Sequence, residues 1–142
     1  MANKNFTFSF ETSKNPEEVF GLLLQIPQWW SGLYQEKIEG KSEKLDDTFS
    51  FKAGGGAHHT EQKVVELVPN KKVVWLVTHS NLTFVSDTQE WEGTRFGFTL
   101  TPEKKKTLVT FTHEGLVPEV ECYDDCALGW SSYLEQLKNK LN

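Results

Sequence analysis

The chain has few features of secreted, membrane-spanning or disulfide-stabilised proteins. It contains only two cysteines, Cys122 and Cys126, and a disulfide between positions four apart would strain a regular helix, so we expect reduced thiols. No apolar run approaches the ~20 residues that a membrane helix needs. The N-terminus lacks the apolar core of a signal peptide. These absences predict a cytoplasmic protein that does not insert into a membrane.

Motifs that carry catalysis or bind cofactors are also missing. The chain has no CxxC, HExxH or GxSxG spacing, and the glycines at 54–56 lack the Lys and Ser/Thr of a phosphate-binding loop. The net charge of −5 argues against nucleic acid as a partner. We therefore predict no metal, no cofactor and no nucleic-acid partner. The sequence identifies no reaction and leaves open whether the protein is an enzyme.

Aromatic residues, in contrast, are abundant. They make up 13% of the 142 residues and include ten Phe and five Trp. A chain of this length suits one domain, which we place at residues 1–142. An aromatic content this high fits either a bulky core or an aromatic-lined pocket.

Alternating apolar residues predict seven strands separated by turns. We place them at residues 6–10, 34–40, 48–53, 60–68, 71–78, 91–101 and 107–114. Adjacent Val64 and Val65 leave the phase of the fourth strand ambiguous, and residues 79–90 are expected to form a loop. Between the first two strands, Asn15 and Pro16 open a helix that should stop before Pro27, followed by a short helical turn at 28–32.

The last segment, residues 118–141, is predicted to form one long amphipathic helix. Its apolar stripe consists of Val120, Tyr123, Ala127, Trp130, Leu134, Leu137 and Leu141. Such a stripe must be buried, and the sheet is the partner available to it. The element order β-α-α-β6-α therefore predicts an α+β fold in which a curved antiparallel sheet wraps around the last helix and leaves room for a cavity between them.

Several motifs resemble a known superfamily. They are PEEVF at 16–20, WW at 29–30, VELVP at 65–69, VVW at 73–75, FTLTP at 98–102, VTFTHEGL at 109–116 and GW at 129–130. They resemble the START-like (SRPBCC) superfamily, and within it the branch named for the C-terminal domain of the activator of Hsp90 ATPase. The resemblance implies the helix-grip fold and a cavity under the last helix. Its members include lipid carriers, hormone binders, polyketide cyclases and cochaperone domains.

Candidate ligand-binding residues follow from the predicted inward faces. The aromatic candidates are Trp30, Trp75, Phe96, Phe98, Phe111 and Trp130, each of which could instead fill the core. His113 follows Val109 and Phe111 in period two, so it should point inward and could orient a ligand or act as a base. His79 is in phase with Trp75 and is also expected inside.

Three further positions qualify the predicted site. The Tyr133 hydroxyl faces either the cavity mouth or water. Gly129 inside the helix indicates close approach of another element or room for a ligand. His58 and His59 are adjacent and should point to opposite faces of a strand.

Three functions remain open at this stage. The favoured one is a binding protein for a small hydrophobic or aromatic ligand. The second is a cyclase- or hydrolase-like enzyme that uses His113 and His79. The third is an interaction domain of the Hsp90-cochaperone type. A weak homodimer stays open, and a chaperone partner stays open without being favoured.

Overall fold

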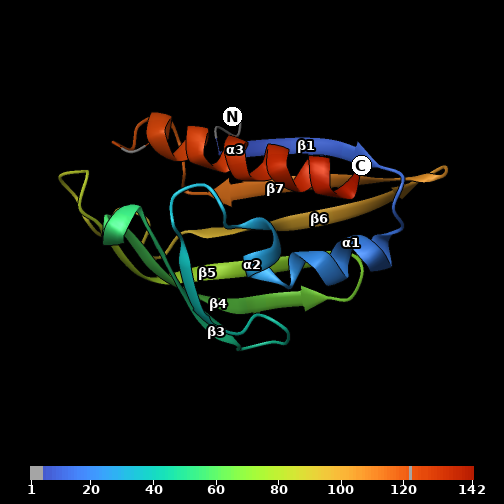
Figure 1. Cartoon of the computed structure of the whole chain (residues 1–142), viewed down its shortest axis with the longest axis horizontal. Coiled ribbons are helices and arrows are strands. Elements are labelled where there is room, and N and C mark those ends of the chain that lie inside the picture. Colours follow the sequence, from blue (N-terminus) through green and yellow to red (C-terminus); the bar gives the residue numbers. More distant parts are fainter. Residues whose placement is uncertain (1–4, 122) are drawn as a thin grey trace.

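The computed structural model describes residues 5–121 and 123–142, and within them one antiparallel sheet has the strand order β1-β7-β6-β5-β4-β3-β2 (Figure 1). The strands are β1 (Phe6–Thr12), β2 (Lys37–Gly40), β3 (Thr48–Ala53), β4 (His58–Val68), β5 (Lys72–Leu82), β6 (Arg95–Glu103) and β7 (Lys106–Glu114). The helices are α1 (Pro16–Leu23), α2 (Ile26–Trp29), the 3-10 turn η1 (Gly54–Gly56) and α3 (Tyr123–Leu141). This order confirms the predicted helix-grip α+β fold.

The long helix α3 lies across the sheet, alongside β1 and above the short helices (Figure 1). Its buried side chains include the predicted Trp130, Leu134, Leu137 and Leu141. The helix begins at Tyr123 rather than at residue 118, because residues 118–121 form turns and a bend. The Glu121 carboxylate in this segment accepts a hydrogen bond from the Ser86 amide. No helix of the described ranges is long and apolar enough to cross a membrane.

The first helix begins as its sequence predicts. The Asn15 side chain accepts a hydrogen bond from the Glu18 amide at 2.8 Å, and Pro16 occupies the first helical position. Helix α1 ends at Leu23, and α2 carries Pro27 in its first turn, where a missing amide hydrogen costs no helical bond. The turn that follows brings Trp30 under α3.

A β-bulge in β5 corrects the prediction for His79. Glu61 pairs with His79 while Gln62 pairs with Val77, so Thr78 is an extra residue on β5. The extra residue reverses the alternation, and Ser80 becomes buried while His79 becomes exposed. The predicted inward orientation of His79 is therefore wrong. The ring centroid of His79 lies 5.6 Å from that of His59 on the neighbouring strand β4.

A second bulge, at Val65, accounts for the ambiguous phase of β4. Val64 pairs with Trp75 and Glu66 pairs with Val74, so Val65 is skipped. Val64 is fully buried as a result, whereas Val65 is only partly buried. The bulge lets both valines occur in one strand without a break in pairing.

The core between the sheet and the helices is built from aromatic rings. Phe98 lies 5.2 Å from Trp29 and 5.1 Å from Phe111, and Trp75 lies 5.6 Å from Phe96, as measured between ring centroids. All five side chains are at most 1% exposed. This packed region supports the more open end of the sheet, where the candidate site lies.

Candidate functional site

A cavity of about 290 Å³ lies between the sheet and the N-terminal half of α3. The sheet side contributes Phe51 and Ala53 of β3, Gly54 of η1 and His58 of β4. The cavity lies at the end of the molecule where the β5–β6 connection and the start of α3 meet, which is the left side of Figure 1. The fold thus leaves a space of the kind that a small ligand occupies.

Stacked aromatic rings form the inner wall of the cavity. Trp30 stacks on Phe51 with centroids 3.9 Å apart and on Trp130 with centroids 4.9 Å apart. Trp91 lies nearly parallel to Trp130 at 5.8 Å. Because each ring is held by its neighbours, this wall is largely formed before any ligand arrives.

Gly129 leaves the helical side of the cavity open. A Cβ atom at this position would have no heavy atom within 4 Å, and Gly129 lines the cavity together with Cys126. Of the two explanations for this mid-helix glycine, the structure therefore favours room beside the helix over close approach. The helix tolerates a residue that costs about 1 kcal/mol relative to alanine.

His113 lies behind the cavity wall rather than in it. The indole Nε1 of Trp130 donates to His113 Nδ1 at 3.0 Å, and His113 Nε2 lies 2.9 Å from the hydroxyl of Thr94, which itself donates to the carbonyl of Trp91. Because Nδ1 accepts a hydrogen bond, the neutral ring carries its proton on Nε2, which donates to the Thr94 hydroxyl. Both ring nitrogens are therefore hydrogen-bonded within the protein. Burial lowers the pKa of His113 to about 3, which keeps the ring neutral.

The hypothesis that His113 orients a ligand is thus not supported by its position, because it does not line the cavity. His113 is a positioning residue that fixes the Trp130 ring and the Trp91 backbone. A buried polar side chain at this point needs partners, and the protein itself supplies them.

His58 is the histidine that lines the cavity, and sequence reasoning did not select it. Its ring packs edge-on against Trp91 at 4.7 Å and against Phe51 at 5.5 Å, and it stacks on Phe84 at 6.2 Å. Burial lowers the pKa of His58 to about 4. Nδ1 is enclosed and has no hydrogen-bonding partner among the residues that the structure describes. The signal available was the His58–His59 pair, whose phase the sequence could not determine.

The Tyr133 hydroxyl is bound at the edge of the cavity by Glu36. It donates to the Glu36 carboxylate, which also accepts the amides of Gly32 at 2.7 Å, Tyr34 at 2.9 Å and Leu33 at 3.2 Å. Burial would raise the pKa of Glu36, but these hydrogen bonds outweigh it and the pKa is lowered. Burial and the neighbouring carboxylate raise the pKa of Tyr133. This carboxylate therefore joins α3 to the loop after Trp30.

A second contact from α3 holds the same loop. The Gln136 side-chain amide donates to the carbonyls of Trp29 at 3.2 Å and Ser31 at 2.8 Å. Tyr133 and Gln136 lie three residues apart, which places them on one face of the helix. Together they position Trp30 within the cavity wall.

The mouth of the cavity is apolar and exposed. Tyr34 is 47% exposed, Phe84 is 43% exposed and Leu128 is 65% exposed, and all three line the cavity. Leu33, next to Tyr34, is 40% exposed. Such a rim favours the entry of an apolar molecule.

The structure brings together three of the predicted ligand-binding residues, Trp30, Trp130 and Tyr133. The predicted Trp75, Phe96, Phe98 and Phe111 belong to the packed core and do not line this cavity. Sequence reasoning missed five aromatic or imidazole rings of the wall and rim: Tyr34, Phe51, His58, Phe84 and Trp91. Trp91, expected at the start of a strand, precedes β6 in a turn.

A metal has no evident place here. Residues 5–121 and 123–142 contain no group of three or more His, Cys, Asp or Glu able to hold an ion. Cys122 lies outside the described residues, so its predicted relation to Cys126 is not assessed. The titratable side chains that line the cavity are His58, Tyr34, Tyr133, Asp125 and Cys126. The arrangement can bind and enclose a molecule, while the histidine predicted to act as a base is already hydrogen-bonded on both nitrogens.

Similar proteins share this architecture. The chain is similar to the Aha1 dimer from Colwellia psychrerythraea, with 26% identity and a TM-score of 0.75 over 96% of this chain and 95% of that one. It is also similar to a protein from Chromobacterium violaceum, with 20% identity and a TM-score of 0.74 over 97% and 96%. CalU16 from Micromonospora echinospora shares the fold at 13% identity, with a TM-score of 0.65 over 97% and 76%.

No curated protein matches the chain significantly. The family model described as "Activator of Hsp90 ATPase homolog 1-like protein" matches residues 14–142, from the lysine before α1 to the end of the chain. The matched region includes α1, both bulged strands and α3, and therefore all the residues that line the cavity. The chain belongs to the activator of Hsp90 ATPase homolog 1-like family.

Proposed function

We propose that this protein binds a small apolar or aromatic molecule in the cavity between its curved sheet and α3. The observation that carries the proposal is the cavity itself, about 290 Å³ in volume and walled by aromatic side chains. That volume lies near the lower end of the range for small-molecule sites. Burying an apolar ligand there would release water from the exposed apolar side chains of the mouth, Tyr34, Phe84 and Leu128.

The open space at Gly129 supplies a direct test. In Gly129→Leu, the new side chain would occupy the cavity from α3. The matched control is Gly21→Leu, because Gly21 also lies in a helix with nothing within 4 Å of a Cβ and is exposed away from the cavity. Binding of the fluorescent probe N-phenyl-1-naphthylamine should weaken at least about tenfold in Gly129→Leu and stay unchanged in Gly21→Leu. Equal affinities in both variants would contradict the proposal.

An enzymatic role of the cyclase type is less well supported by the geometry. General acid–base chemistry needs converging titratable groups in the pocket. His58 lines the cavity, but the other two histidines considered in the sequence, His79 and His113, lie outside it. We therefore propose binding rather than turnover.

Weak self-association is a second candidate property. The relative from Colwellia psychrerythraea is described as a dimer. Leu33, Tyr34, Phe84 and Leu128 expose apolar surface around the cavity mouth, which a second copy could cover. Sedimentation equilibrium of the wild type and of Leu128→Glu tests this: the variant should stay monomeric at concentrations where the wild type associates. A wild type that is monomeric throughout would contradict it.

A further inference from the structure

His58 brings a polar ring into the apolar inner wall of the cavity. It is the first residue of β4 and lies on the same face of that strand as the fully buried Thr60. Its ring packs among those of Phe51, Phe84 and Trp91, and all four side chains line the cavity. The part of the imidazole that these neighbours leave uncovered therefore faces the cavity.

The two ring nitrogens of His58 have different surroundings. Burial lowers the pKa of His58 to about 4, and the carbonyl of the same residue opposes this shift. Nδ1 is the ring nitrogen within reach of that carbonyl, so the neutral ring carries its proton on Nδ1, which is enclosed and forms no hydrogen bond of normal geometry. Nε2 is not enclosed, and nothing in residues 5–121 and 123–142 hydrogen-bonds to it. Its lone pair is left to accept a hydrogen bond from a ligand.

Other polar side chains of the cavity are already hydrogen-bonded or lie exposed at its mouth. The Tyr133 hydroxyl donates to a carboxylate of the neighbouring loop, and the indole N–H of Trp130 donates to a buried histidine. Asp125 is exposed in the first turn of α3, and Tyr34 is 47% exposed at the rim. A polar group that enters the cavity therefore meets the open nitrogen of His58 on the inner wall.

Aromatic packing alone is a simpler explanation for His58. A phenylalanine could also fill the space between the neighbouring rings, and it would carry no polar nitrogen. A wholly apolar ligand would displace water from Nε2 and leave this nitrogen without a partner, which weakens binding. A ligand with an O–H or N–H group would supply the missing partner.

We propose that the cavity selects molecules that combine an apolar or aromatic body with one hydrogen-bond donor, an O–H or N–H group that donates to Nε2 of His58. This inference rests on the proposed function and adds the polar group of the ligand to it. A phenol is a simple molecule of this class, because its ring suits the aromatic wall and its hydroxyl donates to a neutral imidazole.

Three naphthalene derivatives of similar size test the need for a donor. 1-Naphthol carries an O–H group, 1-methylnaphthalene carries a methyl group in its place, and 1-methoxynaphthalene keeps the oxygen but has no O–H. Isothermal titration calorimetry at neutral pH gives the affinity of each probe. The affinity of 1-naphthol is divided by that of 1-methylnaphthalene, and this ratio is compared between proteins, because the difference in hydrophobicity between the probes then cancels.

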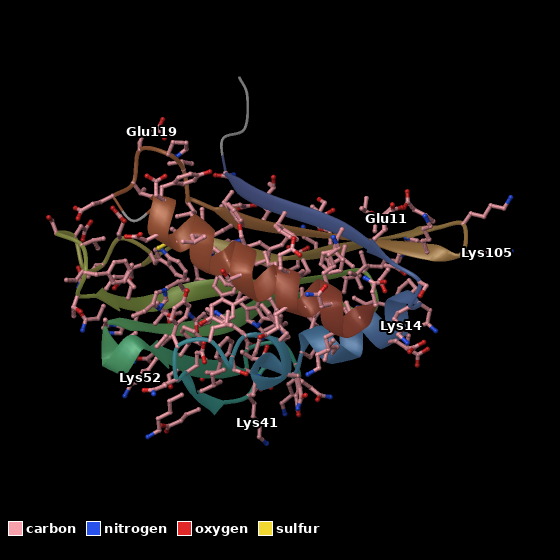
Figure 2. The ribbon with its side chains drawn as sticks, turned by 45° about the horizontal axis from the view of Figure 1, so that its top comes forward. Glu11, Lys14, Lys41, Lys52, Lys105 and Glu119 are labelled. Carbon is pink, nitrogen blue, oxygen red and sulfur yellow. The ribbon has the colours of Figure 1, made fainter. Side chains whose placement is uncertain are left out.

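Two matched variants assign the effect to one ring. His58→Phe keeps a flat ring and removes both nitrogens, so the ratio should fall about fivefold, as expected for the loss of one hydrogen bond. His59→Phe is the control and should leave the ratio unchanged. His59 pairs with Lys52, whose side chain points outward from the sheet in Figure 2, and both line a separate hollow. 1-Methoxynaphthalene should behave like 1-methylnaphthalene in all three proteins.

A measurement on the wild type does not depend on how the variants fold. In ¹⁵N-resolved NMR spectra of the imidazole rings, the proton of His58 should lie on Nδ1 in the free protein. The Nε2 signal should shift when 1-naphthol is added and far less when 1-methylnaphthalene is added. A proton found on Nε2 would overturn the proposal, because that nitrogen would then have no lone pair to offer.

The outcomes distinguish this inference from the proposed function. If the probes bind but the ratio is the same in His58→Phe and in the wild type, the hydrogen bond is wrong and the binding function stands. If His58→Phe weakens 1-methoxynaphthalene as much as 1-naphthol, His58 does not act as the acceptor and the proposal is overturned. If no probe binds to the wild type, the proposed function fails and this inference fails with it. A fall in the ratio confined to His58→Phe supports both.

Discussion

The fully buried His113 and the partly buried His58 differ in the contacts that their ring nitrogens make. His113 has both nitrogens bonded, to Trp130 and Thr94, whereas His58 faces aromatic rings and its Nδ1 has no hydrogen-bonding partner in the described part of the chain. Both stay neutral because burial lowers the pKa of each ring. At the residue scale, His113 therefore organises the wall and His58 forms part of it.

Replacement of His113 by Phe should destabilise the fold. The variant leaves the Trp130 N–H buried without its acceptor, which costs about 1–3 kcal/mol of unfolding free energy. His79→Phe, on the exposed face, serves as the control and should change stability by less than about 0.5 kcal/mol. Urea unfolding measures both. If the two variants are equally stable, the hydrogen-bonded role of His113 is wrong.

The stability of the protein should fall as the pH drops from about 6.5 to about 4. In this window His58 is protonated in the unfolded chain, where its pKa is ordinary at 6.5, and neutral in the folded chain, where its pKa is about 4. The unfolded state then binds more protons, so the unfolding free energy rises with pH and is lost on acidification. In His58→Gln, the pH-dependent contribution of His58 to the unfolding free energy, a few kcal/mol across this window, should disappear. Thermal melts between these pH values measure the loss of stability. If the wild type and His58→Gln lose the same amount on acidification, the prediction is wrong.

The aromatic wall was only partly predictable from single residues. Trp130 lies on the apolar stripe of the helix and Trp30 stands beside Trp29 in the WW pair, and these patterns made both residues candidates; both line the cavity. His58 and Trp91 were missed because neither position has a pattern that reveals its contacts. His58 packs against Trp91 only in the folded chain, because 32 residues lie between them in the sequence.

At the scale of elements, the loop after α2 is bound to α3 through two side chains. Tyr133 bonds the carboxylate of Glu36, and Gln136 bonds the carbonyls of Trp29 and Ser31. The loop carries Trp30, so the geometry of the wall depends on how these two elements are joined.

Removing the carboxylate should loosen the loop without affecting the sheet. In Glu36→Ala, the amides of Gly32, Leu33 and Tyr34 lose their acceptor and should exchange with solvent at least about tenfold faster. Amides in the β6–β7 ladder serve as the internal control and should exchange as in the wild type. Unchanged exchange in the loop would mean that Glu36 does not hold it.

The elements themselves followed from hydrophobic periodicity, and their errors have local causes. Each predicted strand is present in the structure. The strands could be predicted because apolar residues alternate with period two, as they do in β7. The predicted inward and outward faces of β5 are wrong after the bulge at Thr78, and no residue type in that strand indicates a bulge. The strand consequently continues to Leu82, through residues that were expected to form a loop.

At the scale of the whole molecule, the fold separates a packed half from an open half. Core rings fill the region under α2, while the N-terminal half of α3 stands over a space that Gly129 keeps open. A ligand that binds only the folded state stabilises it by mass action. The melting temperature should therefore rise with the concentration of N-phenyl-1-naphthylamine in the wild type and stay constant in Gly129→Leu. A shift of equal size in both proteins would place binding elsewhere.

The most direct test of the binding cavity uses the five tryptophans as reporters of position. Trp30, Trp91 and Trp130 line the cavity, whereas Trp29 and Trp75 belong to the core and do not. During titration with N-phenyl-1-naphthylamine, the indole N–H signals of the first three should shift in the ¹⁵N-resolved NMR spectrum, and those of Trp29 and Trp75 should shift far less. If no indole signal moves at a saturating concentration of the probe, or if only Trp29 and Trp75 respond, the cavity is not the binding site.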